Sequence, residues 1–397
     1  MEADLIGDEI KSVDPNLYSR DYFLNDLDGY ETFVKFNGAL VDPRLKLCLQ
    51  IAGIKKGMNV LDIGCGRGEL VLQSAMRGAN VKGIDYAFSA IELAQEIIPD
   101  ELKGNVALDV LDVKALDEPK NFYDVIFLTD VVEHLYDYEL KVLFEKCAKM
   151  LTLEGIIIIN TAPNTWLYDY VYPVFRGINR QHGGLAKNLR SDFERQIHVN
   201  EQSPGRLAGL LKKVGLVYEP HFSDQNFIPD LVPESDFWRR IAGSKIFEKF
   251  FARTMTFVAG RSYSSCKAAV DRLETLTLQN EKCFVSGWYD FEGEEAGRWS
   301  GKASVMRFLA DQGEVKLMIC FNRPENLYPD TLRVECGDFE KSYDVREDGV
   351  MEIGIPVKKG EFNEVKLMVG KSWCPKETGF NEDERDLGFR VVDVGRE

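Results

Sequence analysis

The sequence predicts an α/β unit with a mostly parallel sheet between helices, followed by a separate all-β sandwich. From about residue 42 to residue 260, short apolar runs alternate with segments of helical periodicity. Such alternation is typical of strand–helix–strand units and a parallel sheet. From about residue 281 onward the helical periodicity largely disappears, and short alternating runs are separated by Gly, Pro, Asn and Asp. This second pattern favours an antiparallel sandwich.

Five apolar runs are expected to form the parallel strands of the first unit. They are NVLDIG (59–64), NVKGIDY (80–86), NVALDV (105–110), YDVIFLTD (123–130) and GIIIIN (155–160). The next segment, GRLAGLLKKVG, predicts a helix that ends at Gly215. The runs LVYEPHF and RTMTFVAG then predict an antiparallel strand pair that completes the sheet.

Four segments follow from these patterns. Residues 1–41 are expected to form an N-terminal helical cap over a ligand cleft, and residues 42–262 the α/β domain. A connecting helix and linker are predicted over 263–280, and the β-sandwich over 281–397. Runs such as EVKLMICF, DTLRVECG, VMEIGIPV, NEVKLMVG and GFRVVDV carry the sandwich prediction.

Composition excludes several classes of partner. A formal net charge of −16 argues against binding to nucleic acid or anionic lipid, because both depend on clustered Lys and Arg. No apolar run approaches the ~18 residues of a membrane span, and no charged-then-apolar leader is present, so a cytoplasmic protein is expected. The eight cysteines are scattered without a C-x-x-C pair, so free thiols and no metal site are predicted.

The glycine-rich turn VLDIGCGRG, which follows the first strand, has two competing interpretations. A dinucleotide site, as in a nicotinamide dehydrogenase, requires a small residue at the third position of G-x-G-x-x-G, but Glu69 stands there. A nucleoside ligand without phosphate fits better, because Gly64 and Gly66 allow a flat turn beneath it. The carboxylate of Asp62 is then available to a positive ammonium group.

Acidic residues end the following strands. Asp85 lies 21 residues after Gly64, where a carboxylate accepts two hydrogen bonds from a ribose diol. Asp112 ends the third strand, where its carboxylate and the Val113 N–H suit an adenine amino group and ring nitrogen. Asp130 ends the fourth strand, shortly before Glu133 and His134, a pair that on its own is typical of a helix start.

The sequence resembles class I S-adenosylmethionine-dependent methyltransferases. The resemblance rests on six segments in this order: VLDIGCGRG, GIDYAFSAI, DVKAL, YDVIFLTDVVEHL, LEGIIIINTAPN and HVNEQSPGRLAGLLKKVGL. Within that family the sequence is similar to the quinone-biosynthesis O-methyltransferase type. The resemblance covers roughly residues 40–262 and implies a Rossmann-like, seven-stranded methyltransferase sheet with S-adenosylmethionine as cofactor.

The resemblance also implies roles for individual residues. It assigns the methionine portion of the cofactor to Asp62, Gly64, Cys65 and Gly66, with Arg44 facing its carboxylate; the ribose to Asp85; and the adenine to Tyr86, Asp112 and Val113. Asp130, at the end of the fourth strand, joins this cofactor-binding set. A solvated helix arginine is the competing interpretation of Arg44.

Methyl transfer to a hydroxyl needs a proton acceptor, and no metal motif is visible to provide one. Two of the four histidines are the main candidates. His182 lies in a glycine-containing loop after the fifth strand, where this fold usually carries its acceptor-binding insertions. His134 lies at the rim of the predicted cleft. His198 and His221 are weaker candidates, and a buried structural histidine is the alternative for each.

The acceptor is predicted only from the C-terminal unit, which resembles β-sandwich modules of surface-glycan assembly enzymes in segments such as GWYDFE, GRWSGKA and KSWCP. A sugar hydroxyl of a glycan or sugar-lipid precursor is therefore the predicted acceptor. A quinone-like small molecule and a non-catalytic cofactor-binding scaffold are the alternatives. A homo-oligomer joined through the sandwich is also compatible with the sequence.

Overall fold

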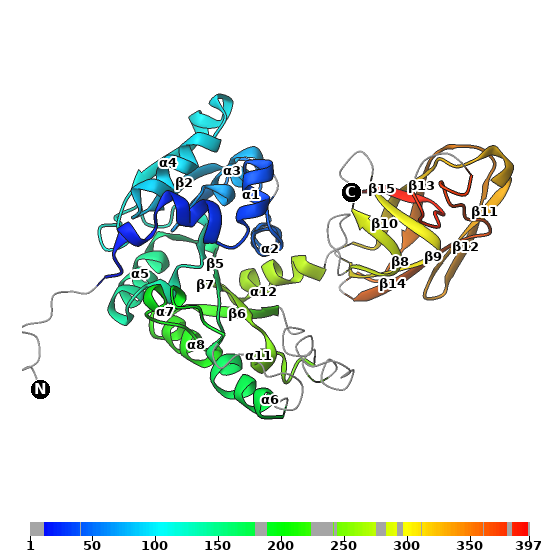
Figure 1. Cartoon of the computed structure of the whole chain (residues 1–397). Helices are drawn as coiled ribbons and strands as arrows, with labels where there is room; N and C mark the ends of the chain where they lie inside the picture. Colours follow the sequence, from blue (N-terminus) through cyan, green and yellow to red (C-terminus); the bar gives the residue numbers. More distant parts are fainter. Residues whose placement is uncertain are drawn as a thin grey trace, which may run out of the picture. The chain divides into compact units, whose positions relative to one another are not determined.

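A computed structural model describes residues 12–39, 41–178, 189–223, 241, 244–274, 283–291, 297–310, 312–359, 361–378 and 383–395. The chain divides into two compact units, residues 1–270 and 271–397. Figure 1 draws both units and labels most of their helices and strands. The α/β class of the first unit and the all-β class of the second confirm the predicted fold class.

The first unit alternates strands with helices along most of its length (Figure 1). Its elements are η1 (Pro15–Leu17), η2 (Tyr22–Asp26), α1 (Tyr30–Phe36), α2 (Pro43–Ala52), β1 (Asn59–Ile63), α3 (Glu69–Met76), β2 (Asn80–Asp85), α4 (Phe88–Ile97), η3 (Asp100–Asn105), β3 (Val106–Val110), β4 (Tyr123–Thr129), η4 (Val132–His134), α5 (Asp137–Met150), β5 (Leu151–Thr161), η5 (Leu167–Val171), α6 (Tyr172–Ile178), α7 (Glu194–Ile197), α8 (Pro204–Lys213), β6 (Val217–Ser223), α11 (Glu248–Phe251), β7 (Thr254–Gly260) and α12 (Tyr263–Asp271).

The strands form one seven-stranded sheet in the order β3-β2-β1-β4-β5-β7-β6. Strands β1 to β5 pair in parallel, whereas β7 pairs antiparallel with both β5 and β6. The order of the strands reverses between β1 and β4, because β2 and β3 extend the sheet on one side and β5 on the other. In open α/β sheets, ligands bind beyond the carboxyl ends of the strands at such a switch point.

The central strands are buried on both faces, which explains their continuous apolar runs. Helices α5 and α8 pack against one face of the sheet. Their buried side chains join those of β1, β4, β5 and β7 in a core that includes Leu61, Ile126, Leu128, Leu143, Phe144, Ile157, Leu207 and Phe257. The sheet therefore provides a rigid base for the loops at its carboxyl edge.

The described part of the N-terminal segment consists of short helical turns and one α-helix. Among the described residues before 42, only α1 is an α-helix, and η1 and η2 are a single 3₁₀ turn and a single π-helical turn. Glycine at 29 and the asparagine–glycine pair at 37–38 adopt positive φ and interrupt helical geometry on both sides of α1. Apolar side chains of this segment, among them Tyr18 and Phe23, nevertheless pack against α4 and the 193–199 region.

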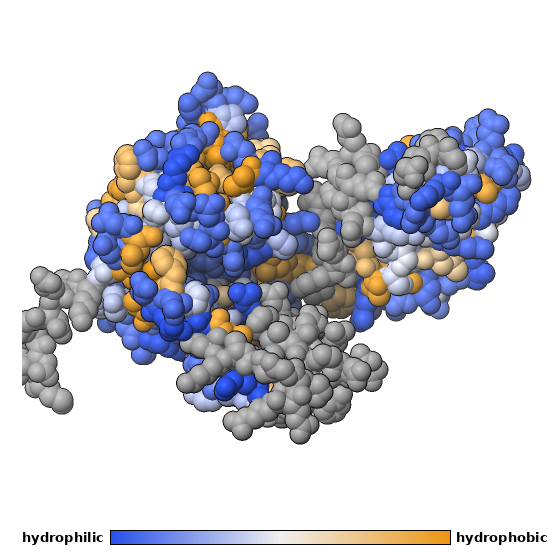
Figure 2. Space-filling model, in the orientation of Figure 1, coloured by the Kyte–Doolittle hydropathy of each residue, from blue (hydrophilic) through white to orange (hydrophobic). Residues whose placement is uncertain are grey.

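Hydrophilic side chains dominate the face shown in Figure 2, and apolar side chains appear there as scattered groups. In the part of the chain that the structure describes, none of the helices has the length and apolar character needed to cross a membrane.

The second unit is an antiparallel all-β structure. Its elements are η7 (Arg272–Glu274), β8 (Phe284–Phe291), β9 (Arg298–Leu309), β10 (Glu314–Phe321), η9 (Glu325–Leu327), β11 (Asp330–Cys336), β12 (Phe339–Val345), β13 (Gly349–Pro356), β14 (Phe362–Val369) and β15 (Arg390–Gly395). The strand order is β12-β11-β14-β9-β15-β10-β13, with β8 paired to β9. The long strand β9 pairs with β14 over most of its length and with β15 at its start.

Side chains from strands far apart in this order meet in one core. It combines residues of β11 and β14 with residues of β10 and β13, including Leu317, Ile319, Leu332, Val334, Ile353, Ile355, Val365 and Leu367. The sheet therefore curves so that its two halves face each other across an apolar layer.

The three tryptophans of this unit do not form an exposed platform for sugar. The indole N–H of Trp288 donates to the Val305 carbonyl at 3.0 Å, and its ring packs against Phe389. Trp373 is buried, and the guanidinium of Arg390 lies over the half-buried ring of Trp299. This arrangement provides no support for sugar binding through these rings.

A buried ion pair connects the loop after β10 with the first residue of β11 in the second unit. Arg323 Nη1 lies 2.9 Å from Asp330 Oδ2, and both side chains are almost completely buried. Asp330 also accepts the N–H groups of Gly370 and Lys371. Removing one partner of such a pair leaves a charge in an apolar environment.

We therefore expect Asp330→Ala to destabilise the second unit by about 3–5 kcal/mol. Urea unfolding of the full chain, followed by tryptophan fluorescence, measures this change. Asp344→Ala is the matched control, because the ion pair between Asp344 and Arg346 is exposed and its loss should change stability little. Equal unfolding midpoints for both variants would contradict the prediction.

Candidate functional site

A cavity lies at the switch point of the sheet, beyond the carboxyl ends of β1, β2 and β4. All ten residues that the sequence assigns to the cofactor line it: Arg44, Asp62, Gly64, Cys65, Gly66, Asp85, Tyr86, Asp112, Val113 and Asp130. His134 lines it as well. The structure thus brings these predicted residues together around one cavity, although they come from five separate segments.

The glycine-rich loop is held against the end of β2. The N–H groups of Gly64 and Cys65 both donate to the Ile84 carbonyl, at 2.8 and 3.0 Å. Gly64 has φ 71°, and a Cβ there would lie 2.5 Å from a methyl carbon of Val131. Gly66 has φ 50°, so it also adopts the left-handed conformation that favours glycine. The loop is therefore a backbone cradle that side chains at these glycines would disrupt.

Two buried carboxylates face the cradle. Asp85 accepts the N–H groups of Gly66 at 3.0 Å and Ala87 at 2.9 Å, which fixes its orientation at the end of β2. Burial raises the pKa of Asp85 to about 6, although these two N–H groups act to lower it. Burial, followed by the negative charges of Asp85 and Glu69, raises the pKa of Asp62 to about 8. This arrangement of acids suits a ligand that carries positive charge.

Arg44 is paired with another predicted site residue. It follows the N-cap Asp42 of α2, whose Oδ1 accepts the N–H groups of Arg44 and Leu45. The Arg44 guanidinium forms an ion pair with Asp130, which has φ 54° at the end of β4. Arg44 is therefore a largely buried, ion-paired cation at the cavity wall.

The loop after β3 is braced from two directions. Asp112 Oδ1 accepts the Lys114 N–H at 2.8 Å, and this bond shapes the turn that carries Val113. The ammonium group of Lys146, on α5, donates to the carbonyls of Val113 and Lys114, at 3.2 and 2.5 Å. These contacts hold the Val113 backbone at the cavity wall.

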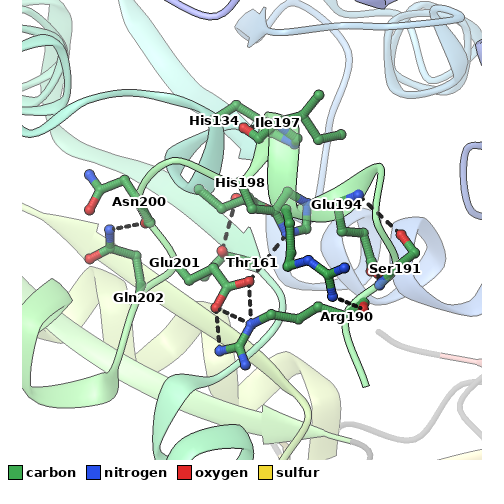
Figure 3. Close-up of polar contacts among 12 residues, drawn as sticks. His134, Thr161, Arg190, Ser191, Glu194, Ile197, His198, Asn200, Glu201 and Gln202 are labelled. Atoms are coloured by element: carbon green, nitrogen blue, oxygen red, sulfur yellow. Dashed lines mark hydrogen bonds and ion pairs between the residues drawn. The ribbon is translucent and has the colours of Figure 1, made fainter. Parts of the chain in front are cut away.

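His134 is held by segments that are distant in the sequence (Figure 3). Its Nδ1 lies 3.2 Å from the Ile197 carbonyl and 2.9 Å from the Tyr18 hydroxyl. Burial, followed by the charge of His198, lowers the pKa of His134 to about 3. The imidazole is thus neutral at physiological pH.

A second cluster lies beside His134. Glu133 is buried, and its Oε2 accepts the Thr161 hydroxyl hydrogen at 2.9 Å. His198 Nδ1 lies 3.6 Å from Glu201 Oε1. Burial acts to lower the pKa of His198, but Glu201 and the charge of Glu133 together raise it above its usual value. Figure 3 shows Glu201 between His198 and Arg190, whose guanidinium completes this network.

Three side chains of this region could together hold a metal ion: those of Glu133, His134 and His198. Each offers one ligand atom, and these atoms lie within 4.8 Å of one another. No other such group occurs among the residues described. Sequence reasoning did not find this group, because His198 lies 64 residues after His134 and no ligand spacing connects them. The only available signal was a histidine just before the closing helix α8.

His182, the first candidate for the proton acceptor, lies outside the described residues.

The N-terminal segment contributes Tyr18, Tyr22, Phe23 and Leu27 to the cavity lining. The sequence indicated a cover for the cleft but not which of its residues reach the cavity.

Comparisons with known proteins relate the first unit to methyltransferases. Residues 34–221 match the model of a family described as "Methyltransferase domain". The chain is 36% identical over 177 residues to a ubiquinone biosynthesis O-methyltransferase of Chelativorans, covering 42% of this chain and 64% of that protein. A protein of the same description from Coxiella burnetii is 29% identical over 185 residues, covering 46% of this chain and 76% of that protein.

The match to these relatives is partial, since the chain spans 64% of the length of the Chelativorans protein and 42% of that of a Bradyrhizobium relative. Among solved structures, phosphoethanolamine N-methyltransferase 2 of Haemonchus contortus, in complex with S-adenosyl-L-methionine, matches with 19% identity and a TM-score of 0.42. This match covers 61% of this chain and 59% of that one.

Proposed function

We propose that the protein is a class I, S-adenosylmethionine-dependent methyltransferase that transfers a methyl group from this cofactor to a hydroxyl group, since residues 34–221 match the methyltransferase domain family. The observation that carries the proposal is the cavity at the switch point, which combines a glycine cradle, buried carboxylates and a neutral histidine. The names of the relatives support oxygen as the methylated atom.

The residues around the cavity fit this cofactor. Arg44 offers a cation to a carboxylate, and the buried acids Asp62 and Asp85 favour a ligand with an ammonium group, a sulfonium group and a ribose diol. S-Adenosylmethionine supplies a methyl group on positively charged sulfur. The cradle and the acids would hold this donor in one orientation, so that an acceptor would meet it in line.

We assign the proton acceptor to His134, which lines the cavity. A backbone carbonyl can only accept a hydrogen bond, so the contact with Ile197 favours the neutral tautomer that carries its hydrogen on Nδ1, where the Tyr18 hydroxyl oxygen can accept it as well. The lone pair is then on Nε2. An alcohol oxygen that gains a methyl group becomes a strongly acidic oxonium, so even an imidazole with a pKa of about 3 accepts its proton.

The acceptor proposal has two versions that one experiment separates. The names of the relatives support a quinone-like small molecule, whereas a glycan or sugar-lipid hydroxyl rests on the sequence resemblance of the second unit alone. Incubation of the full chain with the cofactor and either a catechol or an oligosaccharide, followed by mass spectrometry, detects the added methyl group. If the protein binds the cofactor but methylates neither the catechol nor the oligosaccharide, both versions of the acceptor proposal are contradicted.

Cofactor affinity is expected to depend on pH through the two raised carboxyl pKa values. Asp62 and Asp85 titrate near pH 8 and pH 6, and a cationic ligand binds their ionised forms. Binding should therefore weaken as the pH is lowered from about 8 to about 6. Each carboxylate that must be ionised for binding should weaken the affinity by up to about tenfold per pH unit below its pKa. Calorimetry across this range measures the slope, and Asp62→Asn should flatten its upper part. A flat profile for the unmodified protein would contradict the prediction.

A further inference from the structure

Arg67 stands between two glycines of the cradle, Gly66 and Gly68, and its side chain is almost completely buried. Its Nε and Nη2 lie 2.9 and 2.8 Å from the same oxygen of Glu69. Its guanidinium carbon lies 4.9 Å from the centre of the Phe33 ring. A buried arginine is costly unless its donors are satisfied, so its remaining hydrogen bonds indicate its role.

Those remaining bonds go to the N-terminal segment. Arg67 Nη1 donates to the Phe23 carbonyl at 3.0 Å, and Nη2 donates to the Asp28 carbonyl at 3.0 Å. These two carbonyls lie at the two ends of residues 23–28. This stretch contains most of the turn η2, which begins at Tyr22 and ends at Asp26. The planar guanidinium fork therefore joins the cradle to both ends of this short stretch.

The same stretch forms part of the cavity wall. Phe23 and Leu27 line the cavity, and a Cβ on Gly66 would lie 3.7 Å from a ring carbon of Phe23. The Phe23 ring therefore lies directly over the part of the cradle assigned to the methionine portion of the cofactor. Displacement of residues 23–28 would open the cavity at that point.

The segment also has an arginine contact of a different kind, at Arg20. The ion pair between Arg20 and Glu96 is about half exposed on both sides. Exposed ion pairs contribute little, whereas a buried arginine with several charge-assisted bonds contributes more. The N-terminal segment is thus firmly attached to the cradle at residues 23–28 and only weakly attached at Arg20.

We propose that Arg67 is a positioning residue for the cofactor, because it fixes residues 23–28 as a permanent wall over the methionine end of the cavity. The inference rests on the proposed function for the identity of the ligand. A wall that is already formed before binding removes the cost of ordering it at the moment of binding. The chain would therefore bind the amino-acid part of the cofactor with less loss of conformational freedom.

The test uses the full chain and the variant Arg67→Lys. Lysine keeps a positive charge beside Glu69 but lacks the planar fork that spans two carbonyls. If this variant does not fold, Arg67→Met with Glu69→Leu replaces the whole buried pair by apolar side chains, an exchange that proteins often tolerate. Arg20→Gln is the control, because it removes another arginine contact of the same segment.

The first measurement is amide hydrogen exchange without cofactor. Peptides that cover residues 23–28 should exchange at least about tenfold faster in the Arg67 variant and at an unchanged rate in the Arg20 variant. Unchanged exchange in the Arg67 variant, or equal acceleration in both, would overturn the proposal. This measurement needs no ligand, so it remains valid even if the proposed function is wrong.

The second measurement is calorimetric binding of two probes. S-Adenosylhomocysteine carries the amino-acid part, whereas 5′-methylthioadenosine lacks it. We expect the Arg67 variant to bind the first about tenfold more weakly and the second less than about threefold more weakly. Equal weakening of both probes would overturn the placement of the wall over the methionine end. Failure of the unmodified protein to bind either probe would instead contradict the proposed function.

Discussion

Turnover of a His134→Ala variant is expected to fall by roughly 10²–10⁴-fold, the range for loss of a general base. The alanine removes the Nε2 lone pair that the Ile197 carbonyl leaves available, while the cradle and the buried acids are untouched. Affinity for S-adenosylmethionine should therefore change much less than turnover. Single-turnover kinetics with a saturating acceptor, together with calorimetry of the cofactor, separate the two quantities.

Tyr18→Phe is the matched control for this variant. It removes the hydroxyl 2.9 Å from His134 Nδ1 but keeps the aromatic ring and the Ile197 contact. Its turnover should stay within about tenfold of the unmodified protein if the carbonyl fixes the tautomer. Near-normal turnover of His134→Ala would remove His134 from the mechanism and transfer the role to His182. Loss of turnover on dialysis against a chelator, with recovery on adding a divalent ion, would instead place His134 among metal ligands with Glu133 and His198.

Gly66→Val is expected to abolish measurable cofactor binding, a loss of at least about a hundredfold, in a chain that still folds. A β-branched residue is strained at φ 50°, and its side chain would press on Phe23 in the space above the cradle. Calorimetry with S-adenosylhomocysteine measures the affinity, and circular dichroism checks the fold.

Gly57→Val provides the comparison for this variant. Gly57 also has a positive φ, 84°, but nothing lies within 4 Å of a Cβ at that position. It therefore introduces similar backbone strain away from the cavity and should leave cofactor affinity unchanged. Equal loss of affinity in both variants would mean that strain, and not the cradle, governs binding.

The sequence predicted the sheet well because each strand has a strong local signal. Strand β1, which ends at Ile63, is buried on both faces. Strands of this kind have continuous apolar runs, which are easy to recognise in a sequence. The ligand residues at the strand ends share this advantage, since the strand boundary fixes where Asp85 or Asp130 must lie. Their assignment to parts of the cofactor still rests on the resemblance.

The surroundings of His134 could not be predicted in the same way. Tyr18, Ile197 and His198 lie 63 to 116 residues from His134 in the chain, and no periodic pattern encodes such contacts. The contacts of the N-terminal segment could not be predicted for the same reason, because its apolar residues pack against elements that are distant in the chain.

The position of β7 has a consequence for synthesis on the ribosome. This strand is the last of the first sheet in the chain, yet it lies between β5 and β6 and pairs with both. A nascent chain that ends at Ser223 has already exposed β5 and β6, but the strand that joins them is still missing. Two strand edges then remain open to wrong partners until residues 254–260 emerge, so that stretch of translation is the interval in which the chain most needs protection from aggregation.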